Sequence, residues 1–312
     1  MTTTAQRRAR RIAPLATIAA LALTLAACAD EGESADRGGG GDDGDASGGS
    51  GATLTLEDLQ EAGSITVGFA GEAPYSFMED GELTGATVAL HEAVWAELGV
   101  DTVEGQQAEF GQLIQALTAE RFDVVAAGMS ILPERCEQAI FSDPEFQYTT
   151  ALMVPEGNPD GLEPSMQSVE ESDVQMAAMT GAIEATYAAD LGIDAMEVGT
   201  PQDGMDAVVN GRADVFALTG ISLNWMADNN PDAPIEVTES FVAEIDGVEQ
   251  VGAGGTVFRN ADTELRDAYN EVLAEIVGDE ERYLEIVGDF GFTAEERPTG
   301  DLTTEQLCAG DI

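Results

Sequence analysis

The sequence predicts an α/β fold divided into two lobes, and three observations point to this class. Short apolar segments typical of buried strands alternate with segments of helical periodicity along the folded part of the chain. The chain has 312 residues, which is more than a typical single core holds. Two apolar, β-rich segments, 148–154 and 251–258, are suited to cross between lobes. We therefore expect one lobe from 54–150 together with 254–312, and a second lobe from 151–253.

The first half of the folded part begins with a short buried strand at 65–70, which leads into a loop. An amphipathic helix is expected at 85–98. A second helix is expected at 109–119, because its apolar residues recur at helical spacing. The segment 121–127 is the next buried strand.

The same alternation continues through the second half. The expected strands are 174–179, 197–198 and 213–218, and the expected helices are 182–190, 202–210 and 221–228. Two final helices, 264–277 and 281–288, would return the chain to the first lobe. Strands that alternate with helices predict sheets of parallel strands.

Residues 1–27 have the pattern of an export signal. Four arginines precede an apolar run over 12–27, which is too short to span a membrane. The run ends in Leu25-Ala26-Ala27-Cys28, which resembles a bacterial lipobox and implies cleavage before Cys28 and acylation of its thiol. The alternative is a simple secretory signal followed by an incidental cysteine. Residues 28–53 are rich in Gly, Ser, Asp and Glu, so we expect a disordered tether.

Cys136 and Cys308 remain once Cys28 is assigned to the lipid. In an exported and oxidising setting, an even number of cysteines favours a disulfide. This bond would tie the turn after Arg135 to the C-terminal segment, and closing so long a loop would contribute about 4–5 kcal/mol. Two buried free thiols are the alternative.

The chain is extremely acidic. It has 60 Asp and Glu residues against 12 Arg and no Lys, for a net charge of −48 at pH 7. Such a surface is repelled by nucleic-acid phosphates, so a nucleic-acid partner is excluded. The acidic residues occur throughout the chain, which favours adaptation to high salt over a docking patch. The single histidine, His91, has no cysteine or second histidine near it, so we expect no metal and no cofactor.

One stretch, 126–136, combines features of an anion site. A buried strand ends there, Gly128 lets the backbone approach a ligand, and Pro133 suits the first position of a helix. Arg135 then falls in the first turn, where a cation opposes the helix dipole. Together with free N–H groups and the Ser130 hydroxyl, its guanidinium would form a clamp for a carboxylate. The alternative is an ion pair between Arg135 and an acidic neighbour.

Beyond these patterns, the chain resembles the extracytoplasmic solute-binding proteins of ABC importers, in the polar amino-acid group. The segments that carry this resemblance are 65–69, 126–135, Phe141-Ser142-Asp143-Pro144, Gly211-Arg212-Ala213-Asp214 and 258–273. Within that group it is most similar to the ectoine- and hydroxyectoine-binding lipoproteins. The segments that carry this closer resemblance are 68–70, 72–75, 84–85, 109–114, 127–129, 135–136, 290–293 and 305–308.

The resemblance implies a type II periplasmic-binding-protein fold with two crossing hinge strands and a cleft between the lobes. It further implies a small zwitterionic solute as ligand and ABC permease subunits as partners. The protein would be a monomer, lipid-anchored to the outer face of the cytoplasmic membrane.

Ectoine joins a ring amidinium to a carboxylate, so the resemblance implies an acid, aromatic faces and an anion clamp. Glu72 would accept hydrogen bonds from the ring N–H groups, and Tyr75 and Phe110 would lie against the cation. Arg135 would hold the carboxylate, assisted by the Gly128 backbone. The alternatives are an ordinary exposed loop for Glu72 and core packing for the two aromatic residues.

The second lobe would contribute Thr180 and Gly181, which begin a helix after a strand and would direct N–H groups into the cleft. A plain N-cap role for Thr180 is compatible with this. Two departures from the family pattern stand out. A third aromatic residue of the ectoine site is replaced by Ser130, for which Trp225 could compensate. Binders of α-amino acids usually carry an acid where Thr219 stands, and the uncharged Thr219 argues against an ordinary amino acid.

Three functions compete on this sequence. The first is capture of ectoine or hydroxyectoine for import, and the second is binding of another zwitterion such as a polar amino acid or a betaine. The third is an enzyme, since some dehydratases share the fold. An enzyme needs a positioned general acid, and Glu72 is the only candidate, without a nucleophile–base pair. We therefore expect a binding protein without enzymatic activity.

Overall fold

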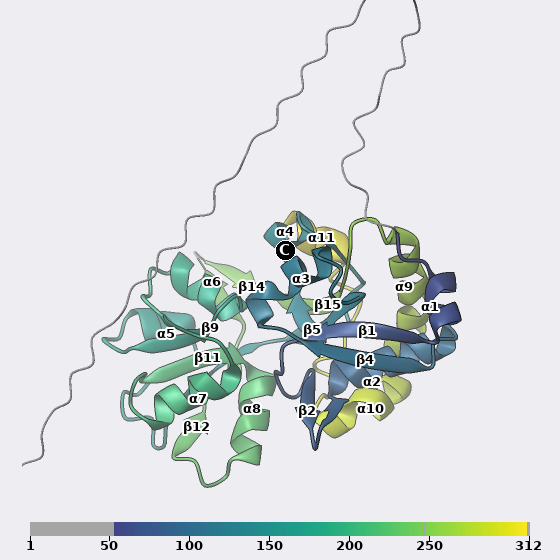
Figure 1. Ribbon diagram of the computed structural model, residues 1–312. Helices are drawn as coiled ribbons and strands as arrows, with labels where there is room; N and C mark the ends of the chain where they lie inside the picture. Colours follow the sequence, from purple (N-terminus) through teal and green to yellow (C-terminus); the bar gives the residue numbers. More distant parts are fainter. Residues whose placement is uncertain (1–52, 246, 311–312) are drawn as a thin grey trace, which may run out of the picture. The chain divides into compact units, whose positions relative to one another are not determined.

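The computed structural model describes residues 53–245 and 247–310 (Figure 1). The expected signal sequence, the acylation of Cys28 and nearly all of the expected tether lie outside these residues. Among the described residues, no helix is both long and apolar enough to cross a bilayer.

The first lobe is built on a mixed sheet with the strand order β4-β1-β5-β15-β6, in which β7 also pairs with β15. Its strands are β1 (Ser64–Phe69), β4 (Thr102–Gln107), β5 (Val124–Ser130), β6 (Ile140–Phe141), β7 (Phe146–Tyr148) and β15 (Gly252–Phe258). Strands β4, β1 and β5 are parallel, whereas β15 runs antiparallel to β5. A short antiparallel hairpin, β2 (Phe77–Glu79) and β3 (Glu82–Thr84), follows β1 in the chain.

Helices pack on both faces of this sheet because side chains alternate along its strands. Val124 and Ala126 of β5 pack with α2, α9 and α10, whereas Val125 and Ala127 pack on the opposite face with α3. The helices of this lobe are α1 (Leu56–Ala62), α2 (Ala86–Glu97), η1 (Phe110–Gln112), α3 (Leu113–Thr118), α4 (Pro133–Cys136), α9 (Thr263–Gly278), α10 (Glu280–Val287), η2 (Gly288–Phe290) and α11 (Thr304–Ala309).

The second lobe is built on a five-stranded sheet with the order β10-β9-β11-β8-β12. Its strands are β8 (Thr150–Pro155), β9 (Met176–Met179), β10 (Met196–Val198), β11 (Val215–Thr219) and β12 (Ile235–Val237). Its helices are α5 (Met166–Glu170), α6 (Ile183–Asp190), α7 (Pro201–Val209) and α8 (Gly220–Asn229). Helices α5 and α6 pack on one face of the sheet, and α7 and α8 on the other.

The chain passes between the sheets twice. The first passage is the step from β7 to β8 at Thr149. The return leads from β12 through the hairpin of β13 (Ala243–Ile245) and β14 (Val248–Gln250) into β15. The two passages lie side by side, since Thr150 and Phe241 exchange backbone hydrogen bonds. The segment 251–258 is therefore mostly a strand inside the first sheet, and the crossing itself falls just before it.

Two details differ from the sequence-based expectation. The sheets are not purely parallel, because β15 and β8, which follow the passages, enter antiparallel to their neighbours. The expected helix over 109–119 is a 3-10 turn at Phe110–Gln112 followed by the shorter helix α3. Gly111 lies in that turn, and glycine is a poor helix former.

A buried polar network supports the first sheet. The Trp95 indole N–H donates to His91 Nδ1 at 3.0 Å, so Nε2 of His91 carries the proton directed at Thr256 Oγ1, 2.7 Å away. The hydroxyl groups of Thr256 and Tyr269 donate to Glu145 Oε1 at 2.5 and 2.7 Å. Burial lowers the pKa of His91 to about 3 and raises the pKa of Glu145 to about 7. His91 is therefore a neutral structural residue, as its sequence context suggested.

Candidate functional site

The carboxyl ends of the parallel strands of both sheets face one another across a cleft, which is where α/β sheets bind ligands. A cavity of about 20 Å³ lies in this cleft. Residues of the first lobe that line it are Glu72, Tyr75, Phe110, Gly128 and Ser130, and those of the second lobe are Met179, Ala182, Ile183, Glu184, Leu218 and Thr219. Six of the nine residues proposed from the sequence for ligand binding therefore meet at one place.

Glu72 lies in the loop after β1 and is 4% exposed. Its Oε1 accepts a hydrogen bond of 2.7 Å from Ser222 Oγ of α8, in the other lobe. Thr219 Oγ1 donates in turn to Ser222 Oγ at 3.1 Å. Burial, together with the charge of Glu184, raises the pKa of Glu72 to about 7. A cation in the cleft would favour its charged form, because an opposite charge offsets desolvation.

Tyr75 is positioned by a glycine. Gly128 has φ +57°, and a Cβ on it would lie 2.4 Å from Cδ1 of Tyr75, so only glycine lets the ring lie against β5. The ring also makes edge contacts with Phe146 and Phe292, at centroid distances of 5.9 and 5.6 Å. Its hydroxyl is buried and has no hydrogen-bond partner among the described residues. Tyr75 thus combines core packing with a buried hydroxyl that has no partner among the described residues, at the edge of the cavity.

Arg135 lies between the lobes and is 9% exposed. Its Nη1 donates to the carbonyl of Ser130 and its Nη2 to the carbonyl of Gly181, both at 2.8 Å. The guanidinium carbon lies 5.6 Å from the centre of the Phe110 ring. No acidic residue of the described chain forms an ion pair with Arg135. Because a guanidinium has five N–H donors, several stay available for a carboxylate.

Arg135 and Gly181 do not line the 20 Å³ cavity but a neighbouring one of about 290 Å³. Phe110 lines both cavities, so the two lie against the same ring. Gly181 (φ +81°) approaches Gly111 so closely that a Cβ on it would lie 2.9 Å from the Gly111 Cα. This pair of glycines is a close contact between the lobes.

Thr180 is placed differently from the other proposed residues. Its side chain is exposed, and Oγ1 donates to Glu197 Oε2 at 3.3 Å. It lines none of the cavities at the cleft given above. Trp225 contacts Phe77 at a centroid distance of 6.0 Å and likewise lines none of them.

Glu184 is a cleft residue that the sequence reasoning missed. It lies in the first turn of α6, is completely buried, and accepts one hydrogen bond, from Thr150 Oγ1 at 3.3 Å. Its Oε2 has no partner among the described residues, and burial raises its pKa to about 7. The sequence did contain a signal. Glu184 lies within the apolar stripe that Ile183, Tyr187 and Ala188 form on α6, where an acid is unexpected.

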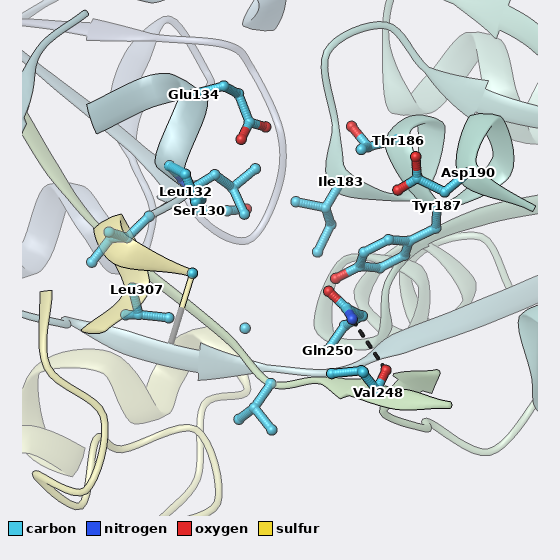
Figure 2. Close-up of a pocket in the computed structure, with 15 residues that line it drawn as sticks. Ser130, Leu132, Glu134, Ile183, Thr186, Tyr187, Asp190, Val248, Gln250 and Leu307 are labelled. Atoms are coloured by element: carbon cyan, nitrogen blue, oxygen red, sulfur yellow. Dashed lines mark hydrogen bonds between the residues drawn. The ribbon is translucent and has the colours of Figure 1, made fainter. Parts of the chain in front are cut away.

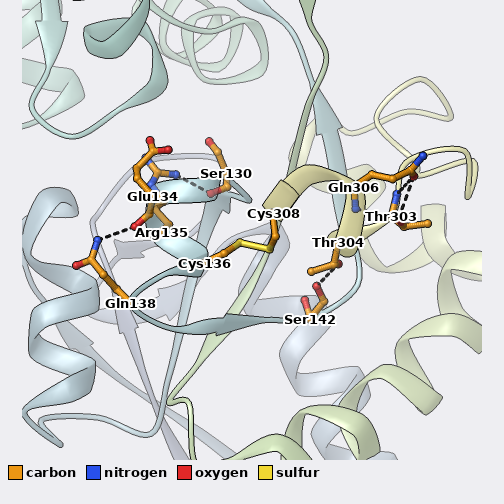
Figure 3. The surroundings of a disulfide bond; sticks show 10 residues. All are labelled: Ser130, Glu134, Arg135, Cys136, Gln138, Ser142, Thr303, Thr304, Gln306 and Cys308. Carbon is orange, nitrogen blue, oxygen red and sulfur yellow. Dashed lines mark hydrogen bonds between the residues drawn. A yellow bond between two sulfur atoms is a disulfide. The ribbon is translucent and has the colours of Figure 1, made fainter. Parts of the chain in front are cut away.

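The C-terminal segment is held beside the clamp. Cys136, next to Arg135, forms a disulfide with Cys308 of α11 (Figure 3). On the same side, Thr304 Oγ1 donates to the carbonyl of Ser142 at 2.8 Å. The disulfide thus fixes the short helix that carries Arg135. Among the described residues, no group of three or more His, Cys, Asp or Glu side chains is arranged to hold a metal ion.

A two-lobed fold with an acid and a guanidinium buried in the cleft defines a class of solute-binding protein. Residues 65–287 match the family described as bacterial extracellular solute-binding proteins, family 3, and the chain belongs to this family. Its fold is the type II periplasmic-binding-protein fold, as the sequence predicted.

Three relatives illustrate the range of this family. A probable amino-acid ABC transporter periplasmic-binding protein of Sinorhizobium fredii is 31% identical over 264 residues, which are 82% of this chain and 86% of the relative. The crystal structure of EhuB in complex with hydroxyectoine shares 30% identity at a TM-score of 0.73, over 81% of this chain and 97% of that one. An ancestral arginine-binding protein bound to arginine shares 26% identity at a TM-score of 0.64, over 73% of this chain and 98% of that one.

Proposed function

We propose that this protein is the substrate-binding lipoprotein of an amino-acid type ABC transporter and captures a small zwitterion, with ectoine or hydroxyectoine as the first candidate. The observation that carries the proposal is that Glu72, Tyr75 and Phe110 line one buried cavity. Beside it, Arg135 has no acidic partner among the described residues. The ligand's carboxylate would bind Arg135, and its delocalised cation would bind Glu72 and the two rings.

Thr219 also supports ectoine. The residue is 8% exposed, lines the cavity and is uncharged. A primary ammonium at this point would find a hydroxyl rather than a carboxylate. The similarity to EhuB, whose structure contains hydroxyectoine, favours the same ligand.

A second candidate, a cationic amino acid such as arginine, is favoured by Glu184. The cleft contains two buried carboxyl groups, Glu72 and Glu184, against one guanidinium. A ligand with one carboxylate and two cations would match this set group for group. The similarity to an ancestral protein bound to arginine agrees with this reading.

Titration calorimetry at high salt with ectoine, hydroxyectoine, arginine, glutamate, proline and glycine betaine would decide between these ligands. Binding of ectoine with rejection of arginine supports the first candidate, and the reverse order supports the second. Failure of every carboxylate-bearing zwitterion to bind would contradict the proposal. We expect no turnover of the bound ligand.

The location is part of the same proposal. Acylation of Cys28 would anchor the protein on the outer face of the cytoplasmic membrane, where a tether lets it reach its permease. Membrane fractions of cells expressing the full chain should contain the protein, whereas the Cys28→Ala variant should be released. Equal release of both forms would contradict lipid anchoring. Light scattering should give the mass of a monomer.

A further inference from the structure

Tyr148 is the last residue of β7, directly before the first passage between the lobes. Its ring lies on the return strand β15 of the same lobe, because two glycines there leave room for it. A Cβ on Gly252 would lie 2.6 Å from Cε2 of Tyr148, and a Cβ on Gly254 would lie 3.2 Å from its Cε1. Tyr148 is therefore anchored in the first lobe, at the point where the two lobes join.

The second lobe nevertheless covers Tyr148, which is 8% exposed. The side chain belongs to a buried cluster whose other buried members, among them Leu152, Ile183 and Tyr187, all lie in the second lobe. Since β15 holds the ring in one lobe and the other lobe covers it, closure of the lobes buries this side chain. Separation of the lobes exposes it to water.

The hydroxyl of Tyr148 is buried and has no hydrogen-bond partner among the described residues. Burial raises the pKa of this hydroxyl above its usual range, so it remains a neutral donor in the closed protein. A polar group that loses its water without gaining another partner destabilises the state in which it is buried. Tyr148 therefore makes closure of the lobes less favourable.

A ligand in the cleft does not relieve this cost. Tyr75 and Glu184 also have buried polar atoms without partners among the described residues, but both line the 20 Å³ cavity, where a ligand group can reach them. Tyr148 lines neither that cavity nor the one of about 290 Å³ beside Arg135. The cost at Tyr148 is therefore the same for every ligand.

A further cavity, of about 260 Å³, lies between the lobes next to this point (Figure 2). Figure 2 shows Ser130 of the first lobe opposite Ile183 and Tyr187 of the second. Gly252, on which the Tyr148 ring lies, lines this cavity, although Tyr148 itself does not. Side chains that face each other across such a space gain little from packing, so this side of the interface does not offset the cost at Tyr148.

We propose that Tyr148 sets the affinity of the cleft by opposing closure: its hydroxyl, which the second lobe buries without a partner, shifts the ligand-free protein toward separated lobes. A ligand must then offset this cost through its preference for the closed form, which lowers its apparent affinity. The inference rests on the proposed function, because ligand binding is the event that closes the lobes. Removal of the hydroxyl should tighten the binding of all ligands alike.

The test compares Tyr148→Phe with the wild type and with Tyr187→Phe as the matched control. Tyr187 belongs to the same buried cluster, but Figure 2 shows its hydroxyl directed into the 260 Å³ cavity. Calorimetry with ectoine, hydroxyectoine and arginine measures affinity, and thermal unfolding shows that each variant is folded.

Tryptophan emission reports closure without any ligand. Trp225 of α8 contacts Phe77 of the first lobe, at a centroid distance of 6.0 Å, so closure should move its emission to shorter wavelength. The second tryptophan of the chain, Trp95, is completely buried in the core of the first lobe and should contribute a constant background.

We expect Tyr148→Phe to bind each ligand that the wild type binds about three- to tenfold more tightly, by one common factor. Without ligand, its emission should lie at shorter wavelength than that of the wild type, and Tyr187→Phe should match the wild type in both measurements. Weaker or unchanged binding, different factors for different ligands, or unchanged ligand-free emission would overturn the proposal. The proposed function fails separately, if the wild type binds none of these ligands, and the ligand-free emission then still decides the role of Tyr148.

Discussion

Ser222 and Glu72 are joined by a hydrogen bond of 2.7 Å across the cleft, although 150 residues separate them in the chain. The hydroxyl of Ser222, on α8 of the second lobe, thereby donates a hydrogen bond to the buried carboxylate of Glu72 in the first lobe. Arg135 makes the complementary contact, from the first lobe to the carbonyl of Gly181 in the second, at 2.8 Å. Glu72 and Arg135, the two charged groups that we assign to the ligand, therefore also join the two lobes.

Replacing Ser222 with alanine should weaken closure. The variant leaves Oε1 of the buried Glu72 without its donor, and a hydrogen bond to a charged group is worth about 1.5–3 kcal/mol. We expect ligand affinity to fall about tenfold or more, as measured by calorimetry. The exposed Asn224 of the same helix provides the control, because Asn224→Ala should bind as the wild type does. Equal affinities for Ser222→Ala and the wild type would mean that this bond is incidental.

The glycine contact between the lobes can be tested with a matched pair. Gly181→Ala and Gly192→Ala both place a side chain at positive φ, +81° and +74°, but only the first brings a Cβ within 2.9 Å of another residue, Gly111. Both variants should lose about 1 kcal/mol of unfolding free energy. Only Gly181→Ala should bind ligand more weakly and show a larger radius of gyration with ligand in X-ray scattering. Identical behaviour of the two variants would refute a closure role.

The buried carboxyl groups should make stability depend on pH. Glu72, Glu145 and Glu184 have pKa values raised by burial to about 7, above their ordinary value of 4.5. A raised native-state pKa means that the contribution to stability is fully present below pH 4.5 and is lost as the pH rises through about 7. Unfolding free energy, measured by denaturant titration without ligand, should therefore decline from pH 5.5 to pH 8.5.

Glu145 separates this effect from general repulsion between surface acids. It lies in the network of Thr256 and Tyr269, outside the cavities of the cleft. Glu145→Gln should reduce the slope of stability against pH, because one titrating group is removed while the surface charge stays nearly constant. An unchanged slope would show that the buried network does not titrate in this range.

Ligand binding should have the opposite dependence on pH. A cationic ligand group favours ionised Glu72 and Glu184, so binding between pH 6 and pH 8 should release protons and strengthen as the pH rises. Calorimetry in buffers of different ionisation enthalpy measures the number of protons released. Proton uptake on binding would contradict our placement of the ligand's cation.

How much of the fold and of the candidate site could be predicted from the sequence depended on whether a local sequence pattern marks the feature. Strands β1, β5 and β11 could be predicted because they are buried apolar segments. Arg135 could be predicted as a site residue because it is a cation in the first turn of a helix that begins with proline, where it opposes the helix dipole. Glu184 was missed because its position in the cleft depends on which residues of the other lobe face α6, and no local sequence pattern shows these. The cavities beside the cleft were beyond prediction for the same reason, since residues far apart in the sequence enclose each of them.

The most direct test of the account is the affinity of Arg135→Ala for whichever zwitterion the wild type binds most tightly. Arg212→Ala, which removes an exposed arginine of the second lobe, is the control. If Arg135 holds the ligand's carboxylate, its loss should lower affinity about a hundredfold while the control binds as the wild type does. A folded Arg135→Ala protein that binds the ligand as tightly as the wild type would contradict the account.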